Sequence, residues 1–127
     1  MKELAAKISG AELEVMEVLW QADGPLPIAP IRRQLVEQRG WDPSTVKTLL
    51  RRLCEKGAVA AEKDQVFHYR PLITRGEYRD WSTHNLIDRV YQGSARALAA
   101  FLVRGDQLTA EDLKELEAML EGERDRG

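Results

Sequence analysis

The sequence predicts a mainly α-helical chain with one small β-hairpin. Apolar residues recur at helical spacing over most of the 127 residues. Two short β-compatible segments, residues 58–62 and 66–70, flank Lys63-Asp64-Gln65 and indicate the hairpin. Three helices followed by a hairpin, over residues 1–72, is the order of a winged helix-turn-helix. Further helices are predicted over residues 73–127, so we expect two domains.

The first two helices have recognisable start and stop signals. Ser9 and Glu12 have the spacing of a capping box, so the first helix is predicted to begin at Ser9. Residues 23–25, Asp-Gly-Pro, break it, and Leu26 is predicted to form a very short strand. A second helix is predicted over residues 27–39, and the glycine after it supplies the tight turn that the motif requires.

The third helix, residues 43–56, carries the most information about function. Asp42 is a suitable N-cap, Pro43 fits the first helical position and Gly57 is a suitable stop. An apolar stripe at helical spacing consists of Val46, Leu49, Leu50 and Leu53. The other positions hold side chains that donate to phosphates and base edges: Ser44, Thr45, Lys47, Thr48, Arg51 and Arg52. This pattern predicts a recognition helix for duplex DNA, assisted by Lys63 at the hairpin tip.

The net charge of −2 by itself argues against nucleic-acid binding. The distribution of charge favours it. Residues 32–70 hold nine Lys or Arg and five Asp or Glu, a net +4, whereas residues 109–127 hold three and seven, a net −4. Such asymmetry is expected of a DNA-binding domain with an acidic extension. On charge alone, a set of solvated faces explains the pattern equally well.

No pattern in the sequence indicates an enzyme, a cofactor or a metal site. His68 and His84 are isolated, and no Cys/His spacing or catalytic triad is recognisable. The single cysteine, Cys54, fits a reducing compartment and is interpreted as a small core residue. No apolar run approaches the ~20 residues that span a bilayer, and the N-terminus lacks the apolar core of a signal peptide. We therefore expect a cytoplasmic protein without membrane insertion.

The C-terminal half is predicted to form helices at about residues 75–91, 94–104 and 109–121, with residues 122–127 frayed. Three short helices cannot cover the large apolar residues that they carry. A second copy of the chain is the simplest cover, so we expect a homodimer. The residues predicted to form its interface are Trp81, Ile87, Val90, Leu98, Phe101, Leu102, Leu113, Leu116 and Leu120.

Four blocks of the sequence also resemble a known family. They are ISGAELEVMEVLW (8–20), WDPSTVKTLLRRLCEKG (41–57), EKDQVFHYRPL (62–72) and the stretch from LIDRVYQG to LEAMLE (86–121). Together they are similar to the penicillinase repressors of the BlaI/MecI type, which are grouped with the copper-responsive CopY repressors. The blocks occur in one order with near-constant spacing, and the resemblance covers about residues 8–121.

The resemblance implies a dimeric transcriptional repressor that occupies a palindromic operator and regulates antibiotic resistance. By position, the family's DNA contacts correspond to Ser44, Thr45, Lys47, Thr48 and Arg52, with the wing at Lys63. Repressors of this family are released from DNA by an upstream signal. The signal leads to proteolysis of the repressor in its C-terminal half, and a membrane sensor protease acts on it indirectly. The family's Asn-Phe cleavage bond corresponds here to Ala100-Phe101. The copper branch carries cysteine pairs near its C-terminus, and this chain has none there.

Several alternatives remain open from the residues alone. The chain is also interpretable as a winged-helix protein-interaction module without sequence-specific DNA binding, or as a small-molecule sensor with a pocket between its halves. The backbone N–H groups at Ser44 and Thr45 are free either to bind a phosphate or to be capped by Asp42. Arg51 is oriented either toward DNA or toward the scaffold. Trp41 is expected to pack against the scaffold and fix the angle of the third helix.

Overall fold

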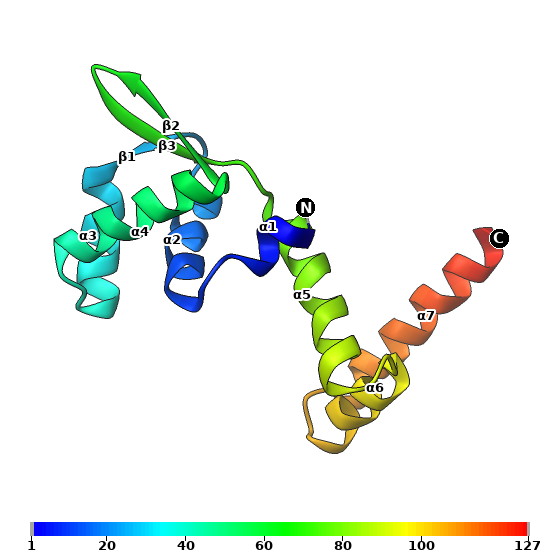
Figure 1. Ribbon diagram of the computed structural model, residues 1–127. Helices are drawn as coiled ribbons and strands as arrows, with labels where there is room; N and C mark the ends of the chain where they lie inside the picture. Colours follow the sequence, from blue (N-terminus) through cyan, green and yellow to red (C-terminus); the bar gives the residue numbers. More distant parts are fainter. Residues whose placement is uncertain (1, 127) are drawn as a thin grey trace. The chain divides into compact units, whose positions relative to one another are not determined.

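The computed structural model describes residues 2–126, which form seven helices and three strands (Figure 1). In chain order these are α1 Lys2–Ala6, α2 Gly10–Gln21, β1 Leu26–Pro27, α3 Ile28–Arg39, α4 Pro43–Lys56, β2 Val59–Asp64, β3 Val66–Pro71, α5 Arg75–Val90, α6 Ala95–Arg104 and α7 Ala110–Arg126. The described residues fall into two compact units, one ending at Ser82 and the other beginning at Thr83. The predicted fold class, mainly α with a small antiparallel sheet, is confirmed.

Local signals set the ends of the first three long helices as predicted. The Ser9 hydroxyl accepts from the Glu12 N–H (3.2 Å) and the Glu12 carboxylate accepts from the Ser9 N–H (2.8 Å), which completes a capping box at the start of α2. Asp42 caps α4, with Pro43 at its first position. Gly40 and Gly57 end α3 and α4 with φ of 67° and 82°, a left-handed conformation that favours glycine.

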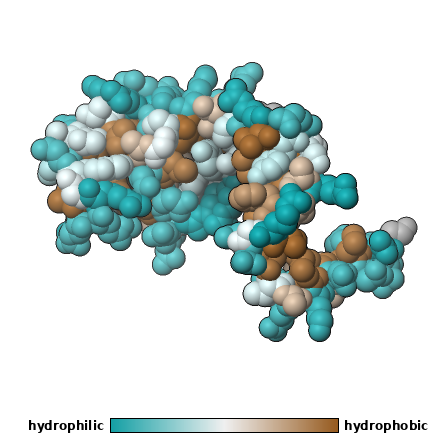
Figure 2. All heavy atoms as spheres, turned by 90° about the horizontal axis from the view of Figure 1, so that it is seen from below, coloured by the Kyte–Doolittle hydropathy of each residue, from teal (hydrophilic) through white to brown (hydrophobic). Residues whose placement is uncertain are grey.

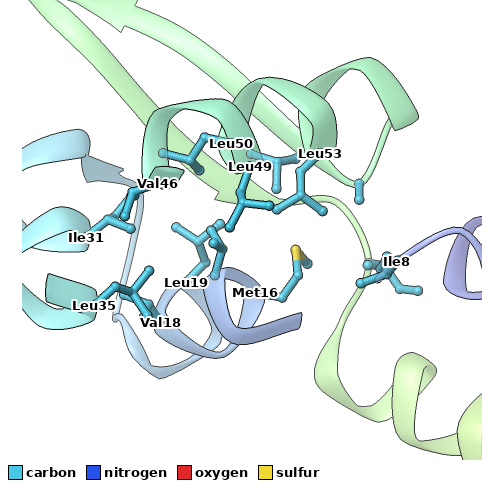
Figure 3. Packing of buried hydrophobic residues seen from close by; sticks show 14 of the residues in the cluster. Ile8, Met16, Val18, Leu19, Ile31, Leu35, Val46, Leu49, Leu50 and Leu53 are labelled. Atoms are coloured by element: carbon cyan, nitrogen blue, oxygen red, sulfur yellow. The ribbon is translucent and has the colours of Figure 1, made fainter. Parts of the chain in front are cut away.

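The hydrophobic core lies where α2, α3 and α4 meet (Figure 3). Its largest fully buried apolar residues are Met16, Ile31, Leu35, Leu50, Leu53 and Ile73. Among the described residues, every buried side chain lies at or before Ile73. The first unit therefore contains the whole buried core of this part of the chain.

The sheet has one more strand than the predicted hairpin. β3 lies between β2 and β1 and pairs antiparallel with both. The strand predicted at Leu26 is confirmed, and Leu26 is paired with Tyr69. The turn is tighter than predicted, because pairing continues to Asp64 and Val66 and leaves Gln65, at φ 66°, as the turning residue. The β2–β3 hairpin, called the wing below, is thus tied at its base to the start of α3.

Two features of the first unit were not predicted. α1 precedes the predicted first helix, and its Ala5 is fully buried in the core. The beginning of α5 also belongs to this unit, since the rings of Trp20, Tyr78 and Trp81 form a chain with centroids 5.9 and 5.8 Å apart. Trp20 additionally donates to the Ile73 carbonyl (2.9 Å). The units consequently separate within α5, later than the expected boundary at residue 72.

The second unit consists of the end of α5 together with α6 and α7. Ser94 caps α6 by accepting from the Ala97 N–H, and Thr109 with Asp112 forms a capping box before α7. The prediction that the chain frays from residue 122 was wrong up to Arg126, because α7 continues to that residue. Ion pairs at i, i+3 spacing, Glu121–Arg124 and Glu123–Arg126, favour this extension. Within residues 2–126, no helix is long and apolar enough to cross a membrane.

Candidate nucleic-acid interface

α4 directs one side to the core and the other to solvent. Its inward residues, Val46, Leu49, Leu50 and Leu53, are all at most 5% exposed and pack against α2 and α3 (Figure 3). They recur at i, i+3, i+4 and i+7, so they occupy one stripe of the helix. Because that stripe is fixed in the core, the opposite stripe is fixed in solvent.

The solvent side of α4 carries all six polar residues predicted to contact DNA. Ser44, Thr45, Lys47, Arg51 and Arg52 are exposed, and Thr48 is half-buried. Among the described residues, Lys47 and Arg52 take part in no ion pair. Arg51 Nε lies 3.9 Å from Glu55 Oε1 in an exposed i, i+4 pair, which holds it only weakly. Arg51 thus faces solvent rather than the scaffold, and the face presents three cations to an approaching partner.

The N-terminus of α4 is capped from within the chain. One carboxylate oxygen of Asp42 accepts from the Ser44 N–H (2.8 Å) and from the Ser44 hydroxyl (2.7 Å), and these bonds lower the pKa of Asp42. The Thr48 hydroxyl donates to the Ser44 carbonyl (3.0 Å). Of the two interpretations of this helix end, self-capping is therefore the one observed. Thr45 and Lys47 keep side chains without an internal partner among the described residues.

An open groove of about 500 Å³ separates α4 from the wing. Its walls are formed by Lys47, Thr48, Arg51, Cys54, Ala61, Phe67 and Tyr69. Phe67 is 51% exposed although it is a large aromatic residue, and Lys63 Nζ lies 6.0 Å from the centre of its ring. Phe67 and Tyr69 lie on one face of β3, because side chains alternate along a strand, and their place beside α4 was not predicted. The lining of the groove thus combines apolar side chains with two cations, Lys47 and Arg51.

Cys54 and Tyr69 are half-buried residues in the lining of this groove. Burial, and to a lesser degree the charge of Glu55, raises the pKa of the Cys54 thiol. Burial, and then proximity to Cys54, likewise raises the pKa of Tyr69. Both groups stay protonated at neutral pH. For Cys54 this agrees with the expected small core residue and disfavours a reactive thiolate.

A buried ion pair fixes the far end of α4. Lys56, its last residue, donates to both carboxylate oxygens of Glu12 (2.6 and 2.8 Å) and to the Lys7 carbonyl (2.8 Å). The Glu12 side chain is 2% exposed and is the one buried charged group among the described residues. Burial raises the pKa of Glu12, but the bonds from Lys56 and Ser9 outweigh it and leave the pKa below its ordinary 4.5. α4 is therefore held by directional contacts as well as by apolar packing.

This arrangement of helices and wing agrees with a match to known proteins. The family described as penicillinase repressors matches residues 8–122. The chain belongs to this family. The resemblance of the four sequence blocks is thereby confirmed.

Two members of the family are similar over nearly the whole chain, and a solved structure is similar over more than half of it. The penicillinase repressor of Bacillus licheniformis is 34% identical over 121 residues, which cover 94% of each chain. The methicillin resistance regulatory protein MecI of Mammaliicoccus sciuri is 31% identical over 115 residues, 90% of this chain and 93% of that protein. A solution structure of monomeric Bacillus licheniformis BlaI in complex with the blaP half-operator has a TM-score of 0.51 and 38% identity, covering 57% of this chain and 88% of that one.

The other predicted residues of this family member lie in different surroundings. Trp41 is half-buried against the core, as expected. Ala100 and Phe101 lie inside α6, and Phe101 is 53% exposed. Trp81 differs from the rest of the predicted dimer residues, because it packs on Tyr78 within the first unit. Trp81 was predicted to lie in the dimer interface because it is a large apolar residue, and that property alone does not show which unit buries it.

Removing the carboxylate charge of Glu12 is expected to lower the free energy of unfolding by about 1–3 kcal/mol, because Lys56 loses its charged partner. The variant Glu12→Gln would be compared with wild type by urea denaturation at one fixed protein concentration. The matched control is Glu14→Gln. Glu14 forms an exposed pair with Arg39, for which at most about 1 kcal/mol is expected.

The same pair gives a pH dependence with a defined sign. A lowered carboxyl pKa stabilises the fold above the ordinary 4.5, and this stabilisation is lost as pH falls through the lower pKa of the folded state. Wild type should lose stability more steeply below pH 4.5 than Glu12→Gln does. Parallel pH profiles for the two proteins would contradict this assignment.

Proposed function

We propose that this chain is a DNA-binding transcriptional repressor that reads duplex DNA through α4 and the wing. The observation that carries the proposal is the solvent side of α4, which exposes Thr45 and on which Lys47 and Arg52 have no ion partner in the described residues. Membership of the penicillinase repressor family supports it. So does the similarity, over 57% of this chain, to monomeric BlaI solved in complex with the blaP half-operator.

The residues of this face have separate roles in the proposal. Thr45 and Thr48 are assigned to base edges in the major groove, where a good contact contributes about 1–3 kcal/mol of discrimination. Lys47, whose ammonium has three donors, is assigned to a base edge and to a backbone phosphate together. Arg51, Arg52 and Lys63 are assigned to backbone phosphates, which supply affinity and make it sensitive to salt. Repression then follows from occupation of promoter DNA, without any chemistry on the DNA.

We also propose that the second unit pairs two copies of the chain. α5, α6 and α7 contain no buried residue, and hydrophobic side chains gather on the surface of α6 and α7 (Figure 2). Seven large apolar residues of this unit are at least 42% exposed: Leu86, Val90, Phe101, Val103, Leu116, Met119 and Leu120. A surface of this kind is typical of a protein interface. A second copy is the partner we favour, with Ile87, Leu98, Leu102 and Leu113 beside the exposed set.

A symmetric dimer has a geometric consequence for its DNA. Two copies of α4 would enter successive major grooves on one face of the duplex, ~34 Å apart. The operator is therefore proposed to be palindromic. Release is proposed to follow an upstream signal that leads to cleavage in the C-terminal half, through a sensor protease acting indirectly.

Neutralising Arg52 is expected to weaken DNA binding in a salt-dependent way. Loss of one phosphate contact lowers the slope of log K against log salt by about 0.9 for each bound subunit. Fluorescence anisotropy of a labelled duplex from the gene's own promoter region would compare wild type with Arg52→Gln. The control is Arg124→Gln, the same charge change in an exposed i, i+3 pair on α7. Wild type that binds no promoter duplex at moderate salt would leave the protein-interaction module as the better description.

Placing a charge on the apolar face of the second unit is expected to separate the dimer. Leu116 is 46% exposed, and Leu116→Glu would bury a carboxylate in the proposed interface. Sedimentation equilibrium should give twice 14.4 kDa for wild type and 14.4 kDa for the variant. The neighbouring exposed Glu115→Gln is the control and should stay dimeric. A wild-type chain that is monomeric at the concentration used for DNA binding would refute the dimer.

Cleavage between Ala100 and Phe101 is expected to release the repressor from DNA. It would detach α7 and the end of α6, which hold most of the exposed apolar residues of the second unit. Mass spectrometry of the chain from cells treated with a β-lactam should find a fragment that ends at Ala100, absent from untreated cells. Recovery of intact chain alone, under conditions where the target gene is expressed, would reject this route.

A further inference from the structure

A second groove borders the α4 surface and involves a helix to which no DNA contact has been assigned. It has a volume of about 290 Å³ and lies between the start of α3, α4 and the wing. The residues that matter are Arg32 from α3, Lys47 from α4, and Phe67 and Tyr69 from β3. Lys47, Phe67 and Tyr69 also line the larger groove, so the two grooves are parts of one surface.

The electrostatics of this groove are one-sided. Arg32 and Lys47 both line it, whereas no Asp or Glu among the described residues does. Neither cation has an ion pair within the described part of the chain. Two like charges that line one groove without a counter-charge repel each other, and an anion between them relieves that repulsion. The groove therefore favours an anionic group.

The guanidinium of Arg32 is partly shielded from solvent and has no acceptor in the described residues. Its Nε is shielded from solvent and has no hydrogen-bond partner in the described residues. A shielded donor that makes no hydrogen bond is costly, and an oxyanion within reach of the guanidinium would offset that cost. The positive charge of Arg32 also acts on Tyr69, where it opposes the effect of burial on the pKa. Arg32 is thus close to the wing as well as to α4.

The beginning of α3 adds to the positive character of the same groove. Pro27, Ile28 and Ala29 line it, and Pro27, at the N-cap, offers no side-chain acceptor to the first turn. The positive end of the helix dipole consequently faces the groove without a capping carboxylate or hydroxyl. The dipole of α3 thus adds to the positive potential that Arg32 and Lys47 produce in the groove.

We propose that Arg32 and Lys47 together bind one backbone phosphate of the DNA, which makes α3 a further DNA-contacting element. The inference rests on the proposed function and deepens it. A phosphate contact carries no sequence information, but it positions the protein on the duplex. Arg32 would therefore set how far α4 enters the groove, while the residues of α4 read the bases.

The neighbouring Arg33 provides a matched control. It lies on the same helix, is exposed, and is not among the residues that line the groove. Arg32→Gln and Arg33→Gln remove the same charge from positions one residue apart. A difference between them reports the groove rather than the net charge of the chain.

The experiment uses the full chain and two labelled duplexes of equal length, one from its own promoter and one unrelated. Anisotropy titrations from about 50 to 200 mM salt give affinity and its salt slope. Arg32→Gln is expected to lower the slope by about 0.9 per bound subunit and to weaken binding about eightfold per subunit at 0.1 M salt, on both duplexes alike. Arg33→Gln should resemble wild type, and Arg32→Lys should restore the slope.

Each other outcome has a defined meaning. Equal effects of Arg32→Gln and Arg33→Gln, or an Arg32→Gln slope equal to that of wild type, would overturn the phosphate contact. Loss of binding by Arg32→Gln with a lower melting temperature and an unchanged slope would assign Arg32 a structural role and also overturn it. Loss confined to the promoter duplex would indicate a base contact instead. A wild-type chain that binds neither duplex would refute the proposed function itself.

Discussion

The burial of one side of α4 is the constraint on which the rest of the first unit depends. Val46 and Leu53 are 0% exposed, and Leu49 and Leu50 no more than 5%. Burying each of these side chains contributes about 1.5–3 kcal/mol, so rotation of α4 about its axis would forfeit several of these terms together. It would also carry Lys47 or Arg51 into the core, where an unpaired charge is not tolerated. The same stripe that stabilises the unit thus decides which side chains face outward.

The Glu12–Lys56 pair adds directional contacts to the apolar packing of α4. Hydrophobic contacts are non-directional, whereas the bonds from Lys56 to Glu12 and to the Lys7 carbonyl fix the last residue of α4 against the start of α2. Glu12 serves two helix ends at once, because it also completes the capping box with Ser9. A recognition helix has to be fixed in position if its side chains are to meet base edges with the correct geometry.

Features that depend on residues close together in the sequence were predicted, whereas features that depend on residues far apart in the sequence were not. Caps such as Ser9, Asp42 and Gly57, and the apolar stripe of α4, depend on residues within one or two turns, so they were predicted correctly. The pairing of Leu26 with Tyr69, the place of Trp81 in the first unit and the groove at Arg32 join segments far apart in the chain. No local pattern encodes such contacts. The i, i+3 ion pairs that favour α7 as far as Arg126 are also local, yet they were not predicted.

The division of burial between the units bears on how a repressor of this kind is switched. Every buried residue in the described chain belongs to the first unit, so that unit has its own core and does not need the second to cover it. If the second unit pairs two copies, its contribution to DNA binding is the effective concentration that it gives to the second α4. Cutting α6 would then remove this gain while leaving each α4 folded. Two weak half-site contacts would replace one strong bivalent contact, and operator occupancy would fall without any unfolding of the reading surface.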